Sequence, residues 1–417
     1  MQPRGRLDIS LRELLAAALP PRKDDPDALV REIGGLWGDA DRTLVALSVR
    51  SAFDAALTAL DWPAGSAVLM SAINIADMGR IVLAHGLDLI PVDVDPETLA
   101  PDPKAIVDLI ERNQSTTGVP PIRALCITHL FGSRIDLTPF AAIASRYGLS
   151  LWEDAAQAWA VETATVRGDR LLDTGDPAVD LSLTSFGLIK THTALGGGLA
   201  RFRDRAWCAL AQSITTDWPR QAESDFFRRS VVRGLALSLL TRPLPFSLVA
   251  NLELRLGRNL DDLLSGATRG FAAGDLLERI RRQPSRRLTT LLRDRLSHPD
   301  PRGAVRRAVI SERYRRELPT EVLVGRRAAF PTTWVFPIRV TAPDVLQTAL
   351  ARAGFDATQR ASRLVQLASL LDRPLAPADW LGDLLYLPLH PELRPAHIAA
   401  IAVIVRQHVA AFPLRAR

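Results

Sequence analysis

Apolar and amphipathic segments alternate through the first half of the chain. An apolar spacing of three or four positions predicts helices at 50–60, 76–86, 103–113 and 137–148. Compact apolar runs between them predict strands at 64–72, 87–95, 122–132, 149–158 and 180–187. Strands that alternate with helices of this length indicate βαβ units, and therefore an α/β fold with a mostly parallel sheet flanked by helices.

Polar side chains follow two of these predicted strands. Asp154 and Gln157 come after the apolar start of 149–158, and Ser185 lies near the end of 180–187. Ligands of parallel sheets bind at the carboxyl ends of the strands. We therefore expect these three residues to lie close to a ligand site.

The pattern changes near residue 205. From 205 to 298 the chain is rich in arginine and predicts amphipathic helices, interrupted by Pro243 and Pro245. Beyond it, the pattern predicts helix, strand, helix, strand and helix at 304–319, 333–340, 342–355, 384–390 and 395–412. We therefore predict a large domain over 1–204, a helical, arginine-rich insertion and linker over 205–299, and a small C-terminal α/β domain over 300–417.

Composition narrows the class of protein. The 417 residues are 47% hydrophobic and 24% charged, which is typical of a globular chain with two or three structural units. Two cysteines, Cys126 and Cys208, exclude a disulfide framework and fit no thiolate metal site, which favours a reducing compartment. No apolar run reaches the roughly 18 residues of a spanning helix, and the first residues do not resemble a signal peptide. These features predict a cytoplasmic protein without a bound metal.

Lysine is rare in this basic chain. Of 52 cationic residues only three are lysines, Lys23, Lys104 and Lys190. The first two lie in polar segments, whereas Lys190 follows an apolar strand and precedes a glycine-rich turn. A partly desolvated lysine can act as a nucleophile and form a Schiff base, which arginine cannot do. Taken alone, Lys190 fits a catalytic amine and a buried salt-bridging lysine equally well.

Several motifs occur together in a specific order. They are PVDVDPETL (91–99), THLFG (128–132), EDAAQA (153–158), SFGLIK (185–190), GGGLA (196–200) and LPLHPEL (387–393). In this order they resemble the DegT/DnrJ/StrS sugar aminotransferases, which are pyridoxal 5'-phosphate (PLP) enzymes of fold type I. The similarity covers most of 40–205 and 300–417.

The resemblance implies a role for each motif residue. Lys190 matches the lysine that forms the Schiff base with PLP and later moves a proton, and Asp154 matches the carboxylate that pairs with the pyridine nitrogen. Gln157 matches the residue beside the ring hydroxyl, and Ser185 matches a phosphate-binding serine. Each residue also has a structural alternative: a helix N-cap for Asp154, a surface turn for Gln157, and a backbone-bonded strand serine for Ser185.

The chain departs from the family at three points. Where the family has a Gly-Thr/Ser pair at the start of the first helix, this chain has Arg50 and Ser51. Arg50 could bind the cofactor phosphate, point outward, or fill the site. Ile75 stands where an aromatic residue commonly stacks on the cofactor ring. The segment 267–288 replaces a family motif whose asparagine reaches the phosphate of the neighbouring subunit, and it contains no asparagine.

Three features keep two interpretations each. His129 and His192 lie near the motifs and could contact substrate, although core or turn roles are favoured. The extra helical stretch 205–264 predicts a lid or a dimer-packing element. Its basic, amphipathic character also suits a membrane surface or an apolar or anionic substrate.

Two functions remain open. The resemblance implies a PLP-dependent aminotransferase, active as a homodimer, that moves an amino group from a donor such as glutamate to a keto or aldehyde acceptor, a sugar or secondary-metabolite precursor. The alternative is a degenerate PLP-fold protein that acts as a binding, scaffold or regulatory protein. Nucleic acid is not an expected partner, because no basic and aromatic module is visible.

Overall fold

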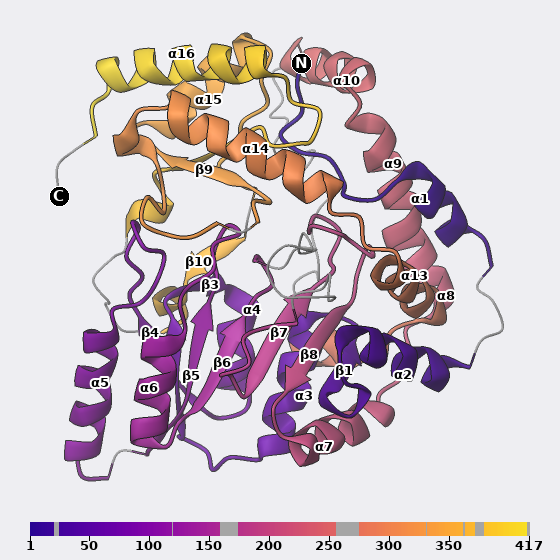
Figure 1. The fold of residues 1–417 in the computed structure, drawn as a ribbon, viewed down its shortest axis with the longest axis vertical. Coiled ribbons are helices and arrows are strands. Elements are labelled where there is room, and N and C mark those ends of the chain that lie inside the picture. Colours follow the sequence, from indigo (N-terminus) through magenta and orange to yellow (C-terminus); the bar gives the residue numbers. More distant parts are fainter. Residues whose placement is uncertain are drawn as a thin grey trace.

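A seven-stranded sheet forms the centre of the computed structural model, which describes residues 1–20, 25–118, 120–158, 174–255, 275–330, 332–361, 363–371 and 379–414 (Figure 1). Its strands, in spatial order, are β4 (Asp88–Val92), β2 (Ala67–Ser71), β5 (Ile122–Thr128), β6 (Ser150–Asp154), β7 (Leu181–Ser185), β8 (Gly198–Phe202) and β1 (Thr43–Ala46). The first five are parallel, and β8 runs antiparallel to both β7 and β1. The predicted α/β fold with a mostly parallel sheet is confirmed.

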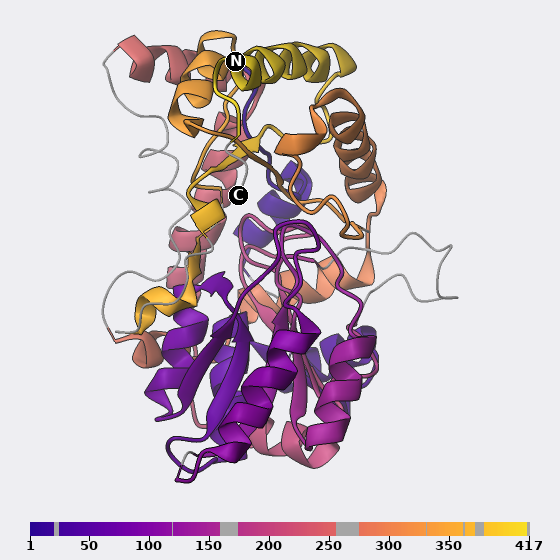
Figure 2. The ribbon, with the colours of Figure 1, turned by 90° about the vertical axis from the view of Figure 1, so that its left-hand side faces the viewer.

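Side chains alternate across this sheet and build a core on each face. Val68 and Met70 of β2 pack with α3 (Val49–Leu60), α4 (Ala76–Ala84) and α7 (Arg205–Thr216). Leu69, between them, packs with α5 (Pro103–Ser115) and α6 (Thr138–Tyr147) on the opposite face. Figure 2 shows the sheet between these two helical layers. Successive side chains of a strand point to opposite faces of the sheet, and helices cover both faces here. Both sets of side chains are therefore buried, which explains why the strand sequence is continuously apolar.

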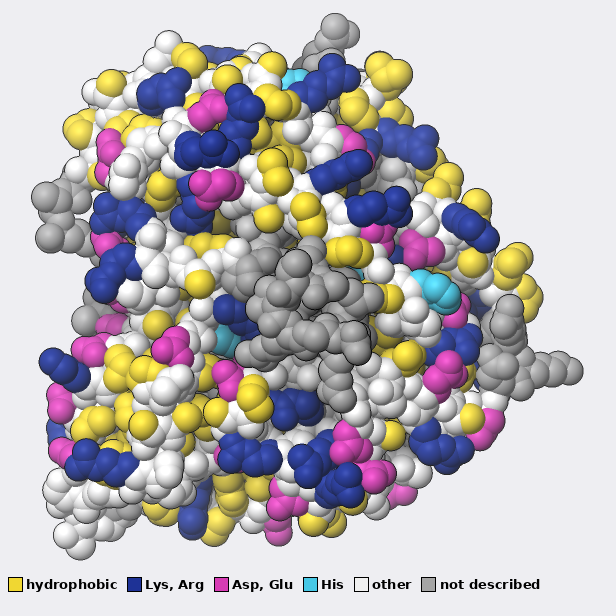
Figure 3. Space-filling view, in the orientation of Figure 1, with side chains coloured by type: hydrophobic (Ala, Val, Ile, Leu, Met, Phe, Trp, Pro, Cys, Tyr) yellow, Lys and Arg dark blue, Asp and Glu magenta, His cyan; other side chains and the backbone are white. Residues whose placement is uncertain are grey.

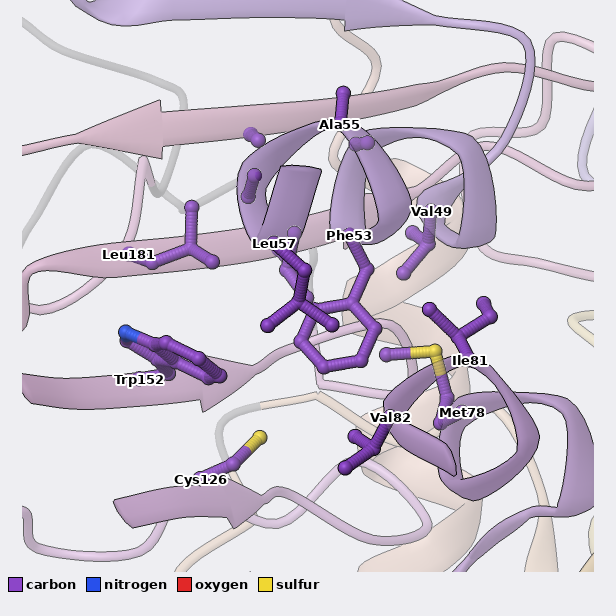
Figure 4. Packing of buried hydrophobic residues seen from close by; sticks show 14 of the residues in the cluster. Val49, Phe53, Ala55, Leu57, Met78, Ile81, Val82, Cys126, Trp152 and Leu181 are labelled. Atoms are coloured by element: carbon purple, nitrogen blue, oxygen red, sulfur yellow. The ribbon is translucent and has the colours of Figure 1, made fainter. Parts of the chain in front are cut away.

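The first of these cores contains a group of contacting aromatic rings. Phe53 of α3 meets Trp152 of β6 edge to face, with ring centroids 5.8 Å apart, and both side chains are fully buried (Figure 4). Trp62 stacks on Trp152, with ring centroids 5.6 Å apart. Aromatic pairs of this kind contribute beyond the area they bury, and they fix α3 firmly on the sheet.

The region after the sheet is helical, as predicted for its described part. It contains α8 (Glu223–Phe226), a π-helical turn (Phe227–Val231), α9 (Val232–Leu240), α10 (Pro243–Arg255), α12 (Leu276–Ile280) and α13 (Arg286–Ser297). The expected break occurs where α9 ends at Leu240 and α10 begins at Pro243. Pro245 falls in the first turn of α10, where its missing N–H has no consequence. Residues 256–274, which include part of the 205–264 insertion and of the 267–288 segment, lie outside the described residues.

The C-terminal part packs three helices over two antiparallel strands. These are α14 (Arg302–Glu317), α15 (Pro343–Arg352), α16 (Pro395–Ala411), β9 (Phe336–Arg339) and β11 (Leu384–Leu387). A third short strand, β10 (Leu364–Gln366), pairs with β3 (Ile73–Ile75) beside the large sheet. The predicted elements of this region are present, and we propose the division into 1–204, 205–299 and 300–417 as domains.

The N-terminal segment has no counterpart in the sequence-based expectations. It forms α1 (Leu11–Ala18), which begins with a capping box between Ser10 and Glu13, and α2 (Pro26–Trp37). Ahead of α1 the chain runs along the C-terminal part, where Gln2 pairs with Phe355 and Arg4 forms an ion pair with Asp356 at 2.7 Å. Figure 1 draws the N-terminus beside α10 and α16. The first residues therefore join the inserted helices to the small domain.

Candidate active site

Lys190 lies in a tight loop between β7 and β8. The loop is closed at its base, where the N–H groups of Ala194 and Gly196 both donate to the carbonyl oxygen of Phe186 at 3.0 and 3.1 Å. The Thr193 hydroxyl lies near the Phe186 and Gly187 carbonyl oxygens, at 3.1 and 2.8 Å, and Thr193 is fully buried. Lys190 itself donates its backbone N–H to Gly187. The two strands thus hold the lysine at the carboxyl end of β7.

The surroundings of Lys190 favour its uncharged form. Burial lowers the pKa of its amine to about 8, with Arg50 acting in the same direction and Asp154 opposing both. Its Nζ lies 4.2 Å from the ring centroid of Trp334, which reaches it from the C-terminal part of the chain. By contrast, Lys104 is exposed at the start of α5, and Lys23 lies outside the described residues. The uncharged amine is the nucleophile, so Lys190 is better suited than Lys104 to form a Schiff base.

Asp154 is the last residue of β6 and is 3% exposed. One carboxylate oxygen accepts the backbone N–H of Ala156 at 3.0 Å, within a turn at 156–158 and not at the start of a helix as the structural alternative predicted. The other accepts the side-chain amide of Asn74 at 3.0 Å. The carboxylate is therefore fixed from two sides, and it is close enough to Lys190 to raise the pKa of that amine.

Asn74 is a site residue that the sequence reasoning missed. It is 2% exposed, and its amide nitrogen also lies 2.9 Å from the Thr128 hydroxyl, while its amide oxygen accepts the N–H of Ile75. Both groups of the side chain are thus engaged, and they fix the orientation in which it meets Asp154. The available signal was one amide side chain in the otherwise mainly apolar run from Val68 to Ile75.

Gln157 lies below the surface, contrary to the surface-turn alternative. It is 9% exposed, and its amide oxygen accepts the backbone N–H of Phe131 at 3.1 Å. Phe131 and Gly132 have φ angles of 59° and 100°, so this bond helps to hold an unusual turn after β5. The turn and Asp154 lie on neighbouring strand ends, because β5 pairs with β6.

Ser185 ends β7, five residues before the lysine. Its hydroxyl is partly buried and accepts the backbone N–H of Gly187 over a long distance of 3.4 Å. A Cβ atom at residue 187 would lie 3.5 Å from the Ser185 hydroxyl and 3.8 Å from Cγ of Lys190. A larger side chain there would enter the space between these two residues.

The start of α3 adjoins the sheet at β8. Ser48 caps the helix, accepting the N–H of Ser51 at 3.3 Å, and the two hydroxyls lie 3.0 Å apart. A Cβ atom on Gly198 would lie 2.4 Å from the Val49 nitrogen, so only glycine permits this close approach. Ser51 is fully buried and is already bonded to Ser48. Its hydroxyl therefore stabilises the helix start.

Arg50 is held in place by an ion pair. Its guanidinium lies 2.8 Å from a carboxylate oxygen of Asp77 in the first turn of α4, and its side chain is 19% exposed. Arg80 contacts the other oxygen of Asp77 at 3.5 Å, from a position that is 59% exposed. The charge of Arg50 lowers the pKa of Lys190, and phosphate binding by Arg50 stays a prediction.

The remaining predicted residue, Ile75, ends β3 opposite Leu364 of β10. It is partly buried against the core beneath α3 and α4. An aliphatic side chain at the edge of this core offers an apolar face to a ring, and ring stacking there stays a prediction.

Both histidines near the motifs belong to buried networks. His129 lies 3.0 Å from Glu153 through Nε2 and accepts the N–H of Ile135 through Nδ1, and burial lowers its pKa. Although burial alone would raise the pKa of Glu153, its contacts with His129 and Arg134 lower it to about 2. His192 is bonded through both ring nitrogens to Arg295, with a pKa lowered to about 4 by burial. These contacts support the core role for both residues.

The residues gathered here fit the functional groups of PLP. Lys190 offers a free amine for the aldehyde, and Asp154 offers a carboxylate for a protonated ring nitrogen. For a phosphate, the structure offers Ser185, Arg50 and the positive end of α3. The groups come from neighbouring strand ends and one helix start, where α/β folds bind such ligands. No cluster of potential metal ligands occurs among the described residues, and none of the described helices is long and apolar enough to cross a bilayer.

Sequence comparison identifies relatives of the first half of the chain. Residues 36–230 match the model of the DegT/DnrJ/EryC1/StrS aminotransferase family. An L-glutamine:2-deoxy-scyllo-inosose aminotransferase from Streptomyces fradiae is 33% identical over 164 residues, which cover 39% of this chain and 35% of the relative. A 3-oxo-glucose-6-phosphate:glutamate aminotransferase from Bacillus subtilis is 31% identical over 140 residues, or 34% of this chain and 27% of the relative. The chain thus spans about a third of the length of the curated relatives it matches.

Structural comparison extends over nearly the whole chain. A DegT DnrJ EryC1 StrS aminotransferase from Brucella abortus superimposes with a TM-score of 0.65 at 18% identity, covering 95% of each chain. A Bacillus subtilis protein solved with bound cofactor PMP gives a TM-score of 0.64 at 16% identity, covering 96% of this chain and 82% of that one. At these identities the likeness establishes the fold, here that of the fold type I PLP aminotransferases. Fold, motif order and sequence match agree, and residues 36–230 are similar to the DegT/DnrJ/EryC1/StrS aminotransferase family.

Proposed function

We propose that this protein is a PLP-dependent aminotransferase. The observation that carries the proposal is the placement of Lys190, an amine with a pKa of about 8, within electrostatic reach of the buried carboxylate of Asp154. Both lie at the carboxyl edge of the sheet in a chain whose residues 36–230 are similar to an aminotransferase family.

Each residue of the site has a distinct task in this proposal. When bound, PLP supplies an electron-withdrawing ring that lets a proton leave the carbon that bears the transferred nitrogen. Lys190 would hold the cofactor through its amine and, when that amine is free, would accept and release a proton at Nζ. Asp154, fixed by Asn74, would keep the ring nitrogen protonated, and Gln157 would meet the ring hydroxyl. Ser185, Arg50 and the first turn of α3 would hold the phosphate, and Ile75 would pack on the ring.

The substrates follow from the relatives. Their names state an amino donor, glutamine or glutamate, and a keto-cyclitol or keto-sugar acceptor. We therefore propose that glutamate or glutamine is the donor and that the acceptor carries a keto or aldehyde group. The amino group replaces the carbonyl oxygen of the acceptor, and the donor becomes the corresponding 2-oxo acid.

Assembly and location belong to the same proposal. A homodimer is expected from the resemblance to the family, and a cytoplasmic location from the two cysteines, which are free and buried. Contact of 205–264 with a membrane is the less favoured alternative. Among its described residues, Leu244 and Leu248 are 81% and 74% exposed, and a flotation assay with anionic vesicles would test it.

The cofactor test uses absorbance and peptide mapping. The purified protein is mixed with PLP, reduced with borohydride and digested, beside Lys190→Ala and the exposed control Lys104→Ala. The proposal predicts a new absorbance band, abolished by borohydride, and a phosphopyridoxyl group on the peptide that contains Lys190 in the wild type and in Lys104→Ala. A Lys190-independent band, or none, would contradict the proposal and favour the degenerate scaffold.

A further inference from the structure

Lys190 also lines a pocket that it does not share with the other proposed cofactor residues. Four segments meet around it: the N-terminal stretch 3–8, the loop 189–191, the inserted helices, and the C-terminal part from Trp334 to Pro391. None of Asp154, Gln157, Ser185 or Arg50 lines it. A ligand in this pocket would thus reach the lysine without displacing the groups that fit PLP, which is where a substrate of the proposed aminotransferase must lie.

The inserted helices supply an apolar wall of the pocket. Leu237 of α9 and Phe246 of α10 line it and are 5% and 3% exposed. Leu7 and Leu389 add further apolar surface from the N-terminal stretch and the C-terminal part. Other leucines of α10, Leu244 and Leu248, are 81% and 74% exposed. Leu237 and Phe246 are therefore buried because they face the pocket, and not because the helices are buried as a whole. Burial of an apolar part of a ligand in this pocket would contribute about 25 cal/mol of favourable free energy per Å² of apolar surface removed from water.

Positive charge exceeds negative charge in the pocket lining. Five cationic side chains line it, namely Arg4, Arg6, Lys190, Arg307 and Arg360, against the two carboxylates of Asp8 and Asp356. Arg4 and Arg307 pair with these carboxylates at 2.7 and 2.8 Å. Arg6 pairs with Glu392, whose side chain is 54% exposed and which is not part of the lining.

This imbalance differs from the outer surface. In Figure 3, cationic side chains (dark blue) and acidic side chains (magenta) are interspersed over the face shown. Concave sites with an excess of one sign concentrate ligands of the opposite sign. An anionic group is therefore favoured in the pocket over a neutral polyol.

We infer that the acceptor is an anionic carbonyl compound with an apolar portion, and that Phe246 and Arg6 determine this specificity. The inference rests on the proposed function for the identity of the site, and it departs from a neutral cyclitol acceptor. The apolar portion lies against α9 and α10, the anionic group lies toward Arg6, and the carbonyl carbon faces Lys190. The inserted helices thus act as a specificity wall of the active site.

Equilibrium binding to the protein without added cofactor tests the pocket independently of turnover. The probes are 4-phenylbutanoate, its neutral counterpart 4-phenylbutan-1-ol, and the neutral polyol scyllo-inositol, each titrated by calorimetry. We expect the acid to bind at least about tenfold tighter than either neutral probe, the gain of one charge-assisted hydrogen bond. Phe246→Ala should weaken the binding of the acid by about tenfold or more. The control Leu248→Ala, on the exposed side of α10, should leave it unchanged.

Arg6→Gln separates charge from packing and covers the case in which Phe246→Ala fails to fold. This substitution should weaken the binding of the acid, whereas the dissociation constant of the alcohol should change by no more than about twofold. Equal affinity for acid and alcohol, tighter binding of the polyol, or an Arg6→Gln protein that still prefers the acid would each overturn the inference. A borohydride-stable label on Lys190 together with any of these results would leave the proposed function intact. A missing label with the expected binding pattern would reject the aminotransferase and keep the pocket.

Discussion

The two sides of Lys190 are built in different ways. On the sheet side, Asp154 and Ser185 come from the ends of two neighbouring strands and lie in motifs that the family shares, whereas the start of α3 departs from the family. On the other side, the walls come from the N-terminal stretch, the inserted helices and the C-terminal part, which join around the lysine only in the folded chain. The sheet side fits a cofactor, whereas the far side carries the features that distinguish this chain. The residues proposed for cofactor chemistry and those proposed for substrate specificity therefore lie in different parts of the fold. Each group can be mutated without changing the other.

The largest effect should come from Asp154. Asp154→Ala removes the carboxylate that is to stabilise the protonated ring nitrogen, so turnover should fall on the order of 10²- to 10³-fold. Steady-state assays with glutamate would measure this loss. Asp88→Asn, an exposed carboxylate at the opposite end of the sheet on β4, is the matched control. Comparable activity of Asp154→Ala and the control would exclude the sheet side as the chemical half of the site.

A smaller effect is expected at Arg50, in the affinity for cofactor. Arg50→Ala should raise the dissociation constant of PLP by about 10- to 100-fold, the magnitude of a charge-assisted hydrogen bond to phosphate. Fluorescence titration with PLP would report it. Arg80→Ala removes the second arginine that contacts Asp77, from the exposed side, and should change the affinity little. If both variants bind equally well, Arg50 does not hold the phosphate.

The attachment of PLP should depend on pH through Lys190. Because burial lowers its pKa to about 8, the free amine increases about tenfold per pH unit below 8 and levels off above it. The observed rate of PLP attachment should follow this curve in stopped-flow absorbance. A rate that keeps rising to pH 10 would mean that Lys190 retains an ordinary pKa, and that the surroundings described here do not act on it.

Asn74 should give the smallest of these effects. Asn74→Leu removes the amide that donates to Asp154 without changing the carboxylate, so cofactor affinity should fall by about tenfold or less. Asn113→Leu removes an amide whose bond is to Pro120 at the far end of α5, and it serves as control. The absorbance band of the bound cofactor should also shift its pH dependence in Asn74→Leu alone. An unchanged pH dependence would give Asn74 a purely structural role.

Much of the sheet side could be read from sequence because its signals are local. Each predicted strand and helix between residues 50 and 187 has a counterpart, since continuous apolar runs and helical spacing are enforced by the two cores on the sheet. Lys190 stood out because it is one of three lysines in an arginine-rich chain and follows an apolar strand, although sequence alone left a buried salt-bridging role equally open. The roles of Ser51 and Arg50 could not be read in the same way. The Ser51 hydroxyl is hydrogen-bonded to the hydroxyl of Ser48, which caps the helix. Arg50 forms an ion pair with Asp77, which is distant in sequence.

The far side of the pocket escaped prediction for a related reason. The N-terminal stretch carries no periodic signal, and its position follows from pairing with Phe355 and Asp356 more than 350 residues away. Likewise, in the sequence Asn74 is only a polar residue in an apolar strand. Its hydrogen bond to Asp154, which is 80 residues further along the chain, is visible only in the fold. Contacts of this range are set by tertiary packing, which a local pattern does not encode.

The most direct test of the central claim is a single-turnover reaction of the PLP-loaded protein. The loaded wild type and Lys190→Ala are each mixed with L-glutamate or L-glutamine, and the released 2-oxo acid is quantified against bound cofactor. We predict that the wild type releases the 2-oxo acid in an amount equal to its bound cofactor, and that Lys190→Ala releases none on the same timescale. Cofactor bound through Lys190 without any 2-oxo acid would contradict the account and would identify the protein as a binding protein similar to an enzymatic family.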